Sequence, residues 1–323
     1  MPGNIDHRQS AIAMLVISLP APLRRLHASA QSQWGRMAPN ARGAALVSIG
    51  SFTLVVMATL VKVLGERLSS FEILFFRSLI GFLLVLPLFI RDPLEPLRTS
   101  RPGMHLLRGI TGALGNACFF WTITHMLLAD AMALQFARPL FMIPLAMIFL
   151  AEFAGWRRAA IALVGFFGIL LYARPFTVGF EPDALIGAAG ALFGGLVVVC
   201  IKRLATTEPT RVIMFYYALW NTVFALGPAL YLWTTPTLVE LVLLTLVGLL
   251  GISGQACITH GLAQGEATAL VPLDYSRIVY SALLGYLLFA ELPGPWSIAG
   301  MALIVMSSLY LVLTEKSKSS SQK

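Results

Sequence analysis

The chain has 323 residues, of which 58% are hydrophobic and only 12% are charged, and its mean hydropathy is +0.81. A soluble domain carries roughly 25% charged residues, so this composition excludes a soluble globular protein and indicates an integral membrane protein with many helices. The net charge of +8 would suggest a nucleic-acid partner for a soluble protein. Here the basic residues lie in short loops between apolar segments, so we expect the lipid bilayer, and no nucleic acid, as the large partner.

Residues 1–42 are predicted to form an N-terminal extension on the cytoplasmic side. Its apolar stretch, Ala11 to Leu19, is too short to span a bilayer. Arg24 and Arg25 interrupt the stretch before a candidate signal-peptidase site, so no signal peptide is expected. Either the extension is flexible or lies on the membrane surface, or translation starts at Met37.

Ten apolar segments follow, and each is close to the roughly 20 residues that a membrane-spanning helix needs. Turn-forming residues separate them, as in Leu292-Pro293-Gly294-Pro295, which ends one helix before the next begins. The predicted fold is an all-α integral membrane protein with ten transmembrane helices. A Ser- and Lys-rich cytoplasmic tail over 315–323 is expected to be disordered. The ten helices are predicted at residues 43–63, 70–90, 104–125, 129–151, 157–174, 184–203, 212–233, 238–261, 267–290 and 296–314.

The loops on the two sides of the predicted membrane differ in charge. An even number of spans places both termini on one side, and the other side has only Lys62, Arg67 and Arg174. Because cytoplasmic loops carry the excess of Lys and Arg, we predict a bacterial inner-membrane protein with both termini in the cytoplasm. The basic residues on that side are Arg24, Arg25, Arg36, Arg42, Arg91, Arg98, Arg101, Arg157, Arg158, Lys202, Arg203, Arg211, Lys316 and Lys318.

One sequence pattern occurs twice, about 139 residues apart. Gly112-x-x-Gly115-Asn116-Ala117-Cys118 returns as Gly251-x-x-Gly254-Gln255-Ala256-Cys257, and Arg138 returns as Arg277. A repeat of this size in a membrane protein is typical of a carrier built from two related halves, with its substrate site where the halves meet. The glycines of each copy are predicted to allow close packing of helices.

The two copies, at 43–174 and 184–314, each contain five predicted helices. Because five is odd, the second copy has to lie upside down in the membrane relative to the first. The loop charges agree, since Trp156-Arg157-Arg158 opens a helix on the cytoplasmic side while its counterpart Trp296 has no arginine beside it. The sequence therefore predicts an inverted repeat.

Arg138 and Arg277 lie near the middle of their predicted helices. Arg138 is nine residues into its helix, which is about 14 Å along the axis, and Arg277 is ten residues into its own. A charge at the bilayer centre is costly and normally faces a cavity or a partner. Either the two arginines line a cavity and bind a carboxylate or phosphate, or they belong to internal ion pairs. Nearby prolines either permit kinks that line a cavity or are ordinary features of membrane helices: Pro139, Pro144 and Pro272.

The residues three positions before the two arginines differ between the copies. Asp274 precedes Arg277, and Gln135 precedes Arg138, so each pair shares a helix face. Asp274 either neutralises Arg277, or exchanges a proton or binds an ammonium group while Arg277 holds a carboxylate. Only the second half therefore has a titratable acid at this place.

Four further residues are predicted to bind the substrate. Asn116 and Gln255 add amide groups beside the glycine pairs, at equivalent places in the two copies. Tyr275 and Trp220 lie toward the middle of their segments, where they either stack on a ring-bearing substrate or pack in the core.

Glu152 and Glu291 end equivalent helices on opposite sides of the membrane. A carboxylate at a helix C-terminus opposes the helix dipole, so each needs a partner or water. We predict that both take part in gating ion pairs, with Arg157 or Arg158 available to Glu152.

Other classes of protein lack their motifs here. The sequence has no Gly-x-x-x-x-Gly-Lys-Ser/Thr phosphate loop, which excludes an ATP-driven pump formed by this chain alone. It has no His-Glu-x-x-His motif and no cysteine cluster, so neither a metal nor another cofactor is expected.

The chain resembles the EamA family of the drug/metabolite transporter superfamily over about residues 43–314. The resemblance lies in Phe75-Phe76-Arg77, in Ala133-Leu134-x-x-x-x-Pro139-Leu140, and in the placing of Glu152 and Glu291. The stretch His105-Leu106-Leu107-Arg108-Gly109, with Arg138 and Arg277, is similar to S-adenosylmethionine uptake carriers of this family. The resemblance implies a carrier of amino acids, nucleotide-linked compounds or other metabolites.

The predicted function is therefore secondary transport of a small metabolite, such as an amino acid, S-adenosylmethionine or a related carboxylate-bearing compound. Alternating access, coupled to substrate exchange or to protons, would move the two halves around the site. The alternatives are a channel or a non-catalytic membrane partner protein, and behind these a membrane-embedded enzyme. The protein is expected to act as a monomer or a homodimer.

Overall fold

The computed structural model describes residues 38–89, 92, 98–150, 156–173, 181–204, 206–264, 270 and 273–320. Over these ranges the chain is helical apart from turns and loops and contains no β-strand, which confirms the all-α prediction. The predicted N-terminal extension up to residue 37, Glu152 and Pro272 lie outside the described residues. The helices are α3 (Pro39–Leu64), α4 (Ser70–Val85), η1 (Leu86–Phe89), α5 (Pro102–His125), α6 (Leu128–Gln135), α7 (Arg138–Leu150), α8 (Trp156–Ala173), α9 (Pro182–Leu204), α10 (Thr210–Tyr231), α11 (Leu238–Gln264), α13 (Ser276–Phe289) and α14 (Pro295–Ser320).

Local sequence sets several helix boundaries. α3, α5, α9 and α14 begin with a proline, whose missing N–H has no partner to lose in the first turn. α4 begins after Ser69, whose hydroxyl accepts a hydrogen bond from the Glu72 amide at 3.2 Å. α13 ends at Phe289, and the next residue, Ala290, has a left-handed φ of 54° that turns the chain away from the helix axis.

Five stretches of the described helices are long and apolar enough to cross a membrane, as judged by length and composition. The other predicted spans are shorter or more polar: α4 has 16 residues, and α5 contains His105, Arg108 and Asn116. Three shorter apolar helices accompany them, at Ala160–Leu171, Ser276–Phe289 and Pro295–Ser307. The five long stretches are Ala41–Leu64, Leu128–Phe149, Pro182–Ile201, Thr210–Tyr231 and Leu238–Gly261.

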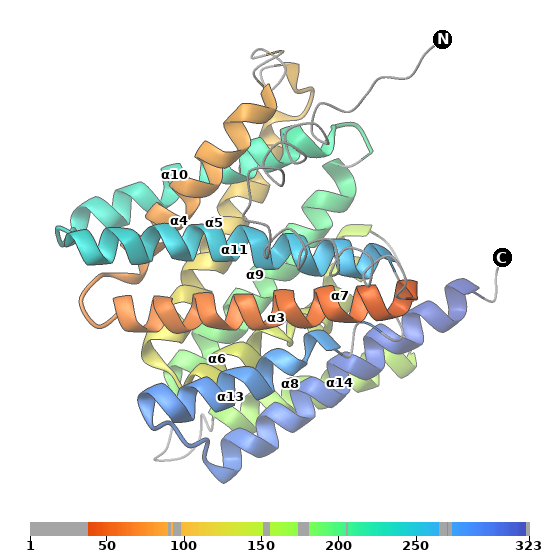
Figure 1. Ribbon diagram of the computed structural model, residues 1–323. Helices are drawn as coiled ribbons and strands as arrows, with labels where there is room; N and C mark the ends of the chain where they lie inside the picture. Colours follow the sequence, from red (N-terminus) through yellow and green to blue (C-terminus); the bar gives the residue numbers. More distant parts are fainter. Residues whose placement is uncertain are drawn as a thin grey trace.

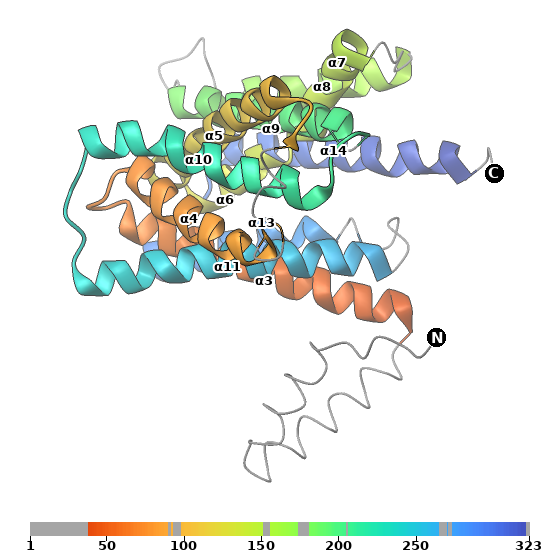
Figure 2. The same cartoon turned by 90° about the horizontal axis from the view of Figure 1, so that it is seen from above.

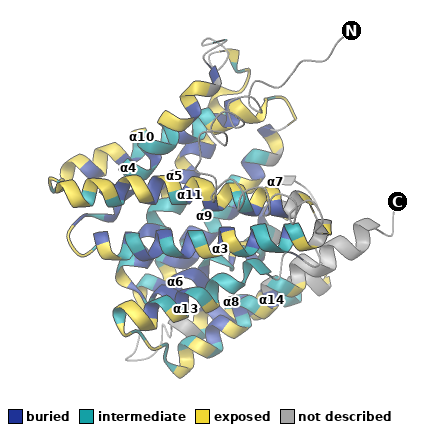
Figure 3. Ribbon diagram, viewed as in Figure 1, coloured by how far each residue is buried: buried dark blue, intermediate teal, exposed yellow. Residues whose placement is uncertain are grey.

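Exposed apolar side chains cover the outer faces of the helices. Leu230 is 60% exposed, Val239 is 69% exposed and Leu287 is 62% exposed. Figure 3 shows exposed residues along α10, α11 and the outer edge of α13, with buried residues toward the middle of the molecule. Exposing so large an apolar surface to water is unfavourable, so this surface is suited to contact with lipid.

Two of the predicted helices are not continuous. Instead of one helix over 129–151, α6 ends at Gln135 and α7 begins at Arg138. The intervening turn is tight, with hydrogen bonds of 3.0 Å from Phe136 N to Ala133 O and from Ala137 N to Leu134 O. Pro139 has no N–H to donate to the Gln135 carbonyl, which weakens a regular helix at this point.

The second interruption lies at the equivalent place in the other half. The prediction of a single helix over 267–290 is wrong because α13 begins only at Ser276, after a turn at Tyr275. Pro144, in contrast, lies inside α7 without ending it. Both breaks therefore immediately precede the arginines that the repeat pairs with each other, Arg138 and Arg277.

Helices from the two halves pack in pairs. α3 packs along α11, α5 along α9, α4 along α10 and α8 along α14, while α6 contacts α13. Figures 1 and 2 show α3 beside α11 and α5 beside α9 in both views. The repeat relates α3 to α9 and α11 to α5, so these two pairs are the same contact formed twice. This pairing is expected of an inverted repeat.

The two ends of the molecule can be told apart by their charged residues. α3 begins and α14 ends at the same end, on the right in Figure 1. We call the opposite end the Lys62 face; it carries Lys62, Glu240 and Glu291 at the ends of α3, α11 and α13. On the predicted topology the Lys62 face lies outside the cytoplasm.

Glycines allow the paired helices to touch backbone to backbone. A Cβ atom placed on Gly50 of α3 would lie 2.7 Å from the carbonyl oxygen of Gly254 on α11, and one on Gly254 would lie 3.1 Å from Gly50 O. A Cβ on Gly115 of α5 would lie 3.5 Å from the Gly190 carbonyl oxygen on α9. The prediction that Gly115 and Gly254 serve close helix packing is confirmed.

Gly254→Leu is expected to destabilise the protein by about 1–3 kcal/mol, because the added side chain forces α3 and α11 apart. The measurement is the thermal unfolding midpoint of purified protein in detergent. Gly227→Leu is the matched control, since that glycine also lies within a helix but has no atom within 4 Å of an added Cβ. Equal midpoints for the two variants would contradict the packing role.

Candidate substrate site at the helix breaks

The two helix breaks meet each other inside the molecule. The rings of Phe136 and Tyr275 stack with their centroids 4.2 Å apart and their planes 20° apart. The two residues are counterparts in the repeat, so the approximate twofold axis passes between the rings. The guanidinium of Arg277 lies over the Phe136 ring, 5.3 Å from its centroid. The stack holds the charged residues of both halves in one region.

Arg277 forms an internal ion pair. Its Nε donates to Asp274 Oδ1 at 2.8 Å, and its second guanidinium nitrogen binds Asp274 Oδ2. Ser51 of α3, which is fully buried, donates its hydroxyl to the same Oδ1 at 2.8 Å. A two-point contact of this kind neutralises both charges and fixes their orientation. This geometry favours the structural interpretation of Asp274, in which it neutralises Arg277.

Arg138 has a different environment. Its guanidinium donates to the amide oxygen of Gln135 at 2.9 Å and packs against Gly194 of α9. Its side chain is exposed although Ala137 and Leu140 beside it are fully buried, so accessible space reaches the break. Among the described residues no carboxylate hydrogen-bonds to Arg138. Within the described part of the chain, its positive charge is therefore not neutralised by direct contact.

The charged groups at the breaks act on one another. Arg138 lies within electrostatic range of Arg277, Asp274 and Tyr217. Two cations and one anion meet here, so the three ionised side chains carry a net charge of +1. A single anionic group bound beside Arg138 would balance the site.

An amide cluster lies between α5 and α10. Asn116 donates through Nδ2 to the Tyr217 hydroxyl oxygen and to Asn221 Oδ1, both at 2.8 Å. The Tyr217 ring also supports the guanidinium of Arg108, which lies 4.4 Å from the ring centroid. Tyr217, Asn221 and Arg108 were not predicted as site residues. Polar residues within apolar helices were the available signal, and Asn221 is only 1% exposed.

Two predicted ligands stand apart from these contacts. Gln255 is exposed on α11, and Trp220 stacks on Phe224 of the same helix at 5.5 Å between centroids. No hydrogen bond among the described residues connects either side chain to Arg138 or Arg277. Their role in substrate binding stays a prediction.

Glu291 has a defined partner on the Lys62 face. It forms an ion pair with Lys62 at the end of α3 and accepts a hydrogen bond from Leu128 N, at the start of α6, at 2.8 Å. Lys62 also donates to the Met126 carbonyl at 2.5 Å. The two charged side chains are 14% and 11% exposed. They border a cavity of about 480 Å³ that is also lined by His125, Asp130 and Glu181. The Lys62–Glu291 pair thus ties three chain segments together beside an open cavity.

An all-α membrane fold with two interleaved halves and broken helices meeting at its centre is the architecture of a secondary transporter. The comparison with known families gives the same class, because the model of the EamA-like transporter family matches twice, at residues 41–174 and 183–313. The chain belongs to this family.

Three relatives show which transporters the chain is similar to. It is 30% identical over 275 residues to an S-adenosylmethionine uptake transporter of Rickettsia bellii, covering 84% of this chain and 94% of the relative. It is 34% identical to the pseudopaline exporter CntI of Pseudomonas aeruginosa, over 85% and 97% of the two chains. A riboflavin transporter of Brucella anthropi is 30% identical over 74% and 87%.

A solved crystal structure superposes with a TM-score of 0.54 at 19% identity, over 84% of this chain and 98% of the other, and shows the fold alone. The family and the relatives make the protein a multi-pass membrane transporter of small molecules and not an enzyme.

Proposed function

We propose that the protein transports a small carboxylate-bearing metabolite, either an amino acid, S-adenosylmethionine or a related compound, with Arg138 as the group that binds the carboxylate. The observation that carries the proposal is the difference between the two central arginines. Arg277 is neutralised by Asp274, whereas Arg138 is exposed and bound to a neutral amide. Two-point contact with a carboxylate is the geometry for which a guanidinium is suited.

The neighbouring groups suit the rest of such a molecule. The stacked rings of Phe136 and Tyr275 offer an aromatic surface, and Asn116 keeps its amide oxygen to accept a hydrogen bond. S-adenosylmethionine combines a carboxylate, an amino group and an aromatic base, and the Rickettsia relative is named for its uptake. It is therefore the first compound to test.

The transport cycle in this proposal is alternating access. The two halves rock about the stacked breaks, and the Lys62–Glu291 pair closes the Lys62 face in one of the two states. Glu152 is the repeat counterpart of Glu291 and is proposed to act at the opposite face. The proposal places the protein in a bacterial inner membrane with both termini in the cytoplasm.

Glu291→Gln is expected to loosen the Lys62 face. Glutamine can still accept the hydrogen bond from Leu128 N but lacks the charge that holds Lys62, and a partly exposed pair is worth about 1 kcal/mol, or about fivefold in the open population. A membrane-impermeant maleimide should label Ser297→Cys, in a background without native cysteines, about five times faster in this variant. Ser297 lines the cavity.

Arg98→Gln is the control for this labelling experiment, because it removes an exposed ion pair with Asp92, 2.9 Å long, at the opposite end of the molecule. It should leave the labelling rate unchanged. A rate that Glu291→Gln does not alter would show that the Lys62–Glu291 pair is no gate.

Counterflow in liposomes tests the proposed function. Purified protein is reconstituted, loaded with unlabelled S-adenosylmethionine or with one of a panel of amino acids, and exposed to the labelled compound outside. Alternating access predicts that internal substrate accelerates uptake, because the loaded carrier returns faster than the empty one. Uptake that is independent of internal substrate would instead indicate a channel, and no uptake of any carboxylate-bearing compound would contradict the proposal.

A further inference from the structure

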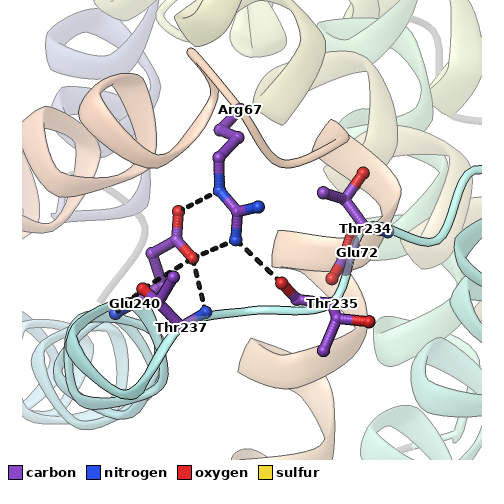
Figure 4. A network of polar contacts seen from close by, with 6 residues as sticks. All are labelled: Arg67, Glu72, Thr234, Thr235, Thr237 and Glu240. Carbon is purple, nitrogen blue, oxygen red and sulfur yellow. Dashed lines mark hydrogen bonds and ion pairs between the residues drawn. The ribbon is translucent and has the colours of Figure 1, made fainter.

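A second charged network lies on the Lys62 face, away from the central site, where Arg67 pairs with Glu240 and a second acid, Glu72, lies nearby (Figure 4). Arg67, in the loop between α3 and α4, donates through Nε to Glu240 Oε1 at 2.6 Å, and its terminal nitrogen binds Glu240 Oε2. The same nitrogen donates to the Thr235 carbonyl at 2.8 Å. These hydrogen bonds to Glu240 raise the pKa of Arg67, so this arginine stays charged.

Glu240 is held from several sides. Besides Arg67, it accepts hydrogen bonds through Oε2 from the Thr237 amide at 2.6 Å and from the Thr237 hydroxyl at 2.9 Å. A carboxylate with this many donors is stabilised in its charged form. Arg67 and Glu240 therefore form a self-contained pair of opposite charges.

The charge of Glu72 is only weakly stabilised by the Arg67–Glu240 pair. Glu72 is fully buried in the first turn of α4, and its Oε2 accepts one long hydrogen bond, 3.3 Å, from the Thr234 amide. Its other oxygen, Oε1, is buried and has no hydrogen-bond partner among the described residues. The charges that act on Glu72 are Arg67 and Glu240, which are opposite in sign and already bound to each other.

A fully buried carboxylate without its own cation is unfavourable, since the charge has lost its water and, among the described residues, has gained only one long hydrogen bond and no ion-pair partner. Binding one proton at Oε1 removes the charge and leaves the Thr234 hydrogen bond at Oε2 intact. Asp274 is unlike Glu72 in this respect, because Arg277 and Ser51 compensate its charge. Of these two acids, Glu72 is the one whose surroundings favour a bound proton.

The position of Glu72 also connects it to the contact between the halves. α4 belongs to the first repeat, and Thr234 lies in the loop between α10 and α11 of the second. The same loop is bound by Arg67 through Thr235. Movement of one half against the other would change the burial of Glu72, which is what a coupling group requires: neutral when buried, charged when water reaches it.

We propose that Glu72 is the proton-binding carboxyl of this transporter and couples substrate movement to proton movement. The proton is taken from water on the Lys62 face when the loop over Glu72 opens and is carried as the neutral carboxylic acid while the loop is closed. It is released to water that enters between the two halves when the opposite face opens. This inference rests on the proposed alternating-access function.

Infrared spectroscopy of the purified protein in lipid tests the bound proton without any substrate. The wild type is expected to show a protonated-carboxyl band at neutral pH that Glu72→Gln lacks. Glu208→Gln is the control: that carboxylate accepts hydrogen bonds from Thr99 and Ser100 in a different part of the chain, so the band should remain. Identical bands in wild type and Glu72→Gln would show that Glu72 is ionised and would overturn the proposal.

Glu240→Gln provides a second readout that a purely structural Glu72 would not give. Removing that acid frees Arg67 to pair with Glu72, so Glu72 should ionise and the band should weaken at the same pH. An unchanged band would overturn the claim that the pairing of Arg67 with Glu240 keeps Glu72 neutral.

The coupling itself is tested in liposomes with labelled S-adenosylmethionine. Glu72→Gln should keep counterflow exchange near the wild-type rate, because a permanently neutral side chain still allows the loaded carrier to move. It should lose the accumulation that a pH gradient drives. Undiminished gradient-driven accumulation by the variant would overturn the proposal. Absence of counterflow in the wild type would instead count against the proposed transport function. The infrared result does not depend on that function, so the two failures can be told apart.

Discussion

Arg138→Gln is expected to weaken the binding of a carboxylate-bearing substrate about 30-fold or more and to stop its transport. A hydrogen bond to a charged group contributes about 1.5–3 kcal/mol, and 2 kcal/mol is about 30-fold in affinity. Glutamine at position 138 can still form a hydrogen bond with Gln135, the present partner of Arg138. It carries no charge, however, and cannot replace the guanidinium as the group that binds a carboxylate. The measurement is the dissociation constant of S-adenosylmethionine, or of the amino acid that the counterflow panel selects.

Two further variants make the Arg138 experiment specific. Arg138→Lys keeps the charge but cannot contact Gln135 and a carboxylate through one planar group, so we expect an intermediate loss of affinity. Arg98→Gln removes an exposed arginine far from the breaks and should bind as the wild type does. Normal affinity and transport by a correctly folded Arg138→Gln protein would remove Arg138 from the site.

Arg277→Gln is expected to act on stability as well as on transport. It leaves Asp274 charged and without its partner at the helix break. Breaking a buried pair costs about 3–5 kcal/mol, and we expect about 2–3 kcal/mol here because the two side chains are still 21% and 18% exposed. The thermal unfolding midpoint in detergent should fall by about 5 °C.

The double variant Arg277→Gln/Asp274→Asn separates the two roles of this pair. Because it removes both charges together, it should recover most of the lost stability, with Ser51 still able to hydrogen-bond the new amide. If Arg277 instead binds the substrate, its loss should affect transport and not stability. Loss of transport in Arg277→Gln with an unchanged unfolding midpoint would show that Arg277 binds substrate, as the symmetric interpretation of the sequence allowed.

The breaks in the helices show what sequence reasoning misses. Composition and the repeat are sufficient to predict an all-α membrane protein of two related halves. The length of the apolar segments predicts the helices, and the spacing of the repeat predicts the halves. Pro139 and Pro144 are chemically identical, yet only Pro139 lies at a break. The difference is tertiary: Phe136 stacks on Tyr275, a residue 139 positions away, and that contact stabilises the turn.

The candidate site has the same mixture of local and distant causes. The repeat pairs Arg138 with Arg277, and the spacing places Gln135 and Asp274 beside them, so the asymmetry of charge is visible in the sequence. The sequence does not show that Ser51 completes the Asp274 contact, because the two residues are 223 positions apart. Lys62 was predicted only as one of three basic residues outside the cytoplasm, and no spacing indicates that it is the partner of Glu291.

Comparison of each ligand with a counterpart that lacks the free carboxylate tests the central claim most directly. S-adenosylmethionine is compared with decarboxylated S-adenosylmethionine, and each amino acid that binds is compared with its methyl ester, by thermal shift and calorimetry on wild-type protein and Arg138→Gln. The account predicts that the wild type prefers the free carboxylate about 30-fold or more, and that Arg138→Gln loses this preference. Equal binding of a ligand and its carboxylate-free counterpart by the wild type would contradict the account.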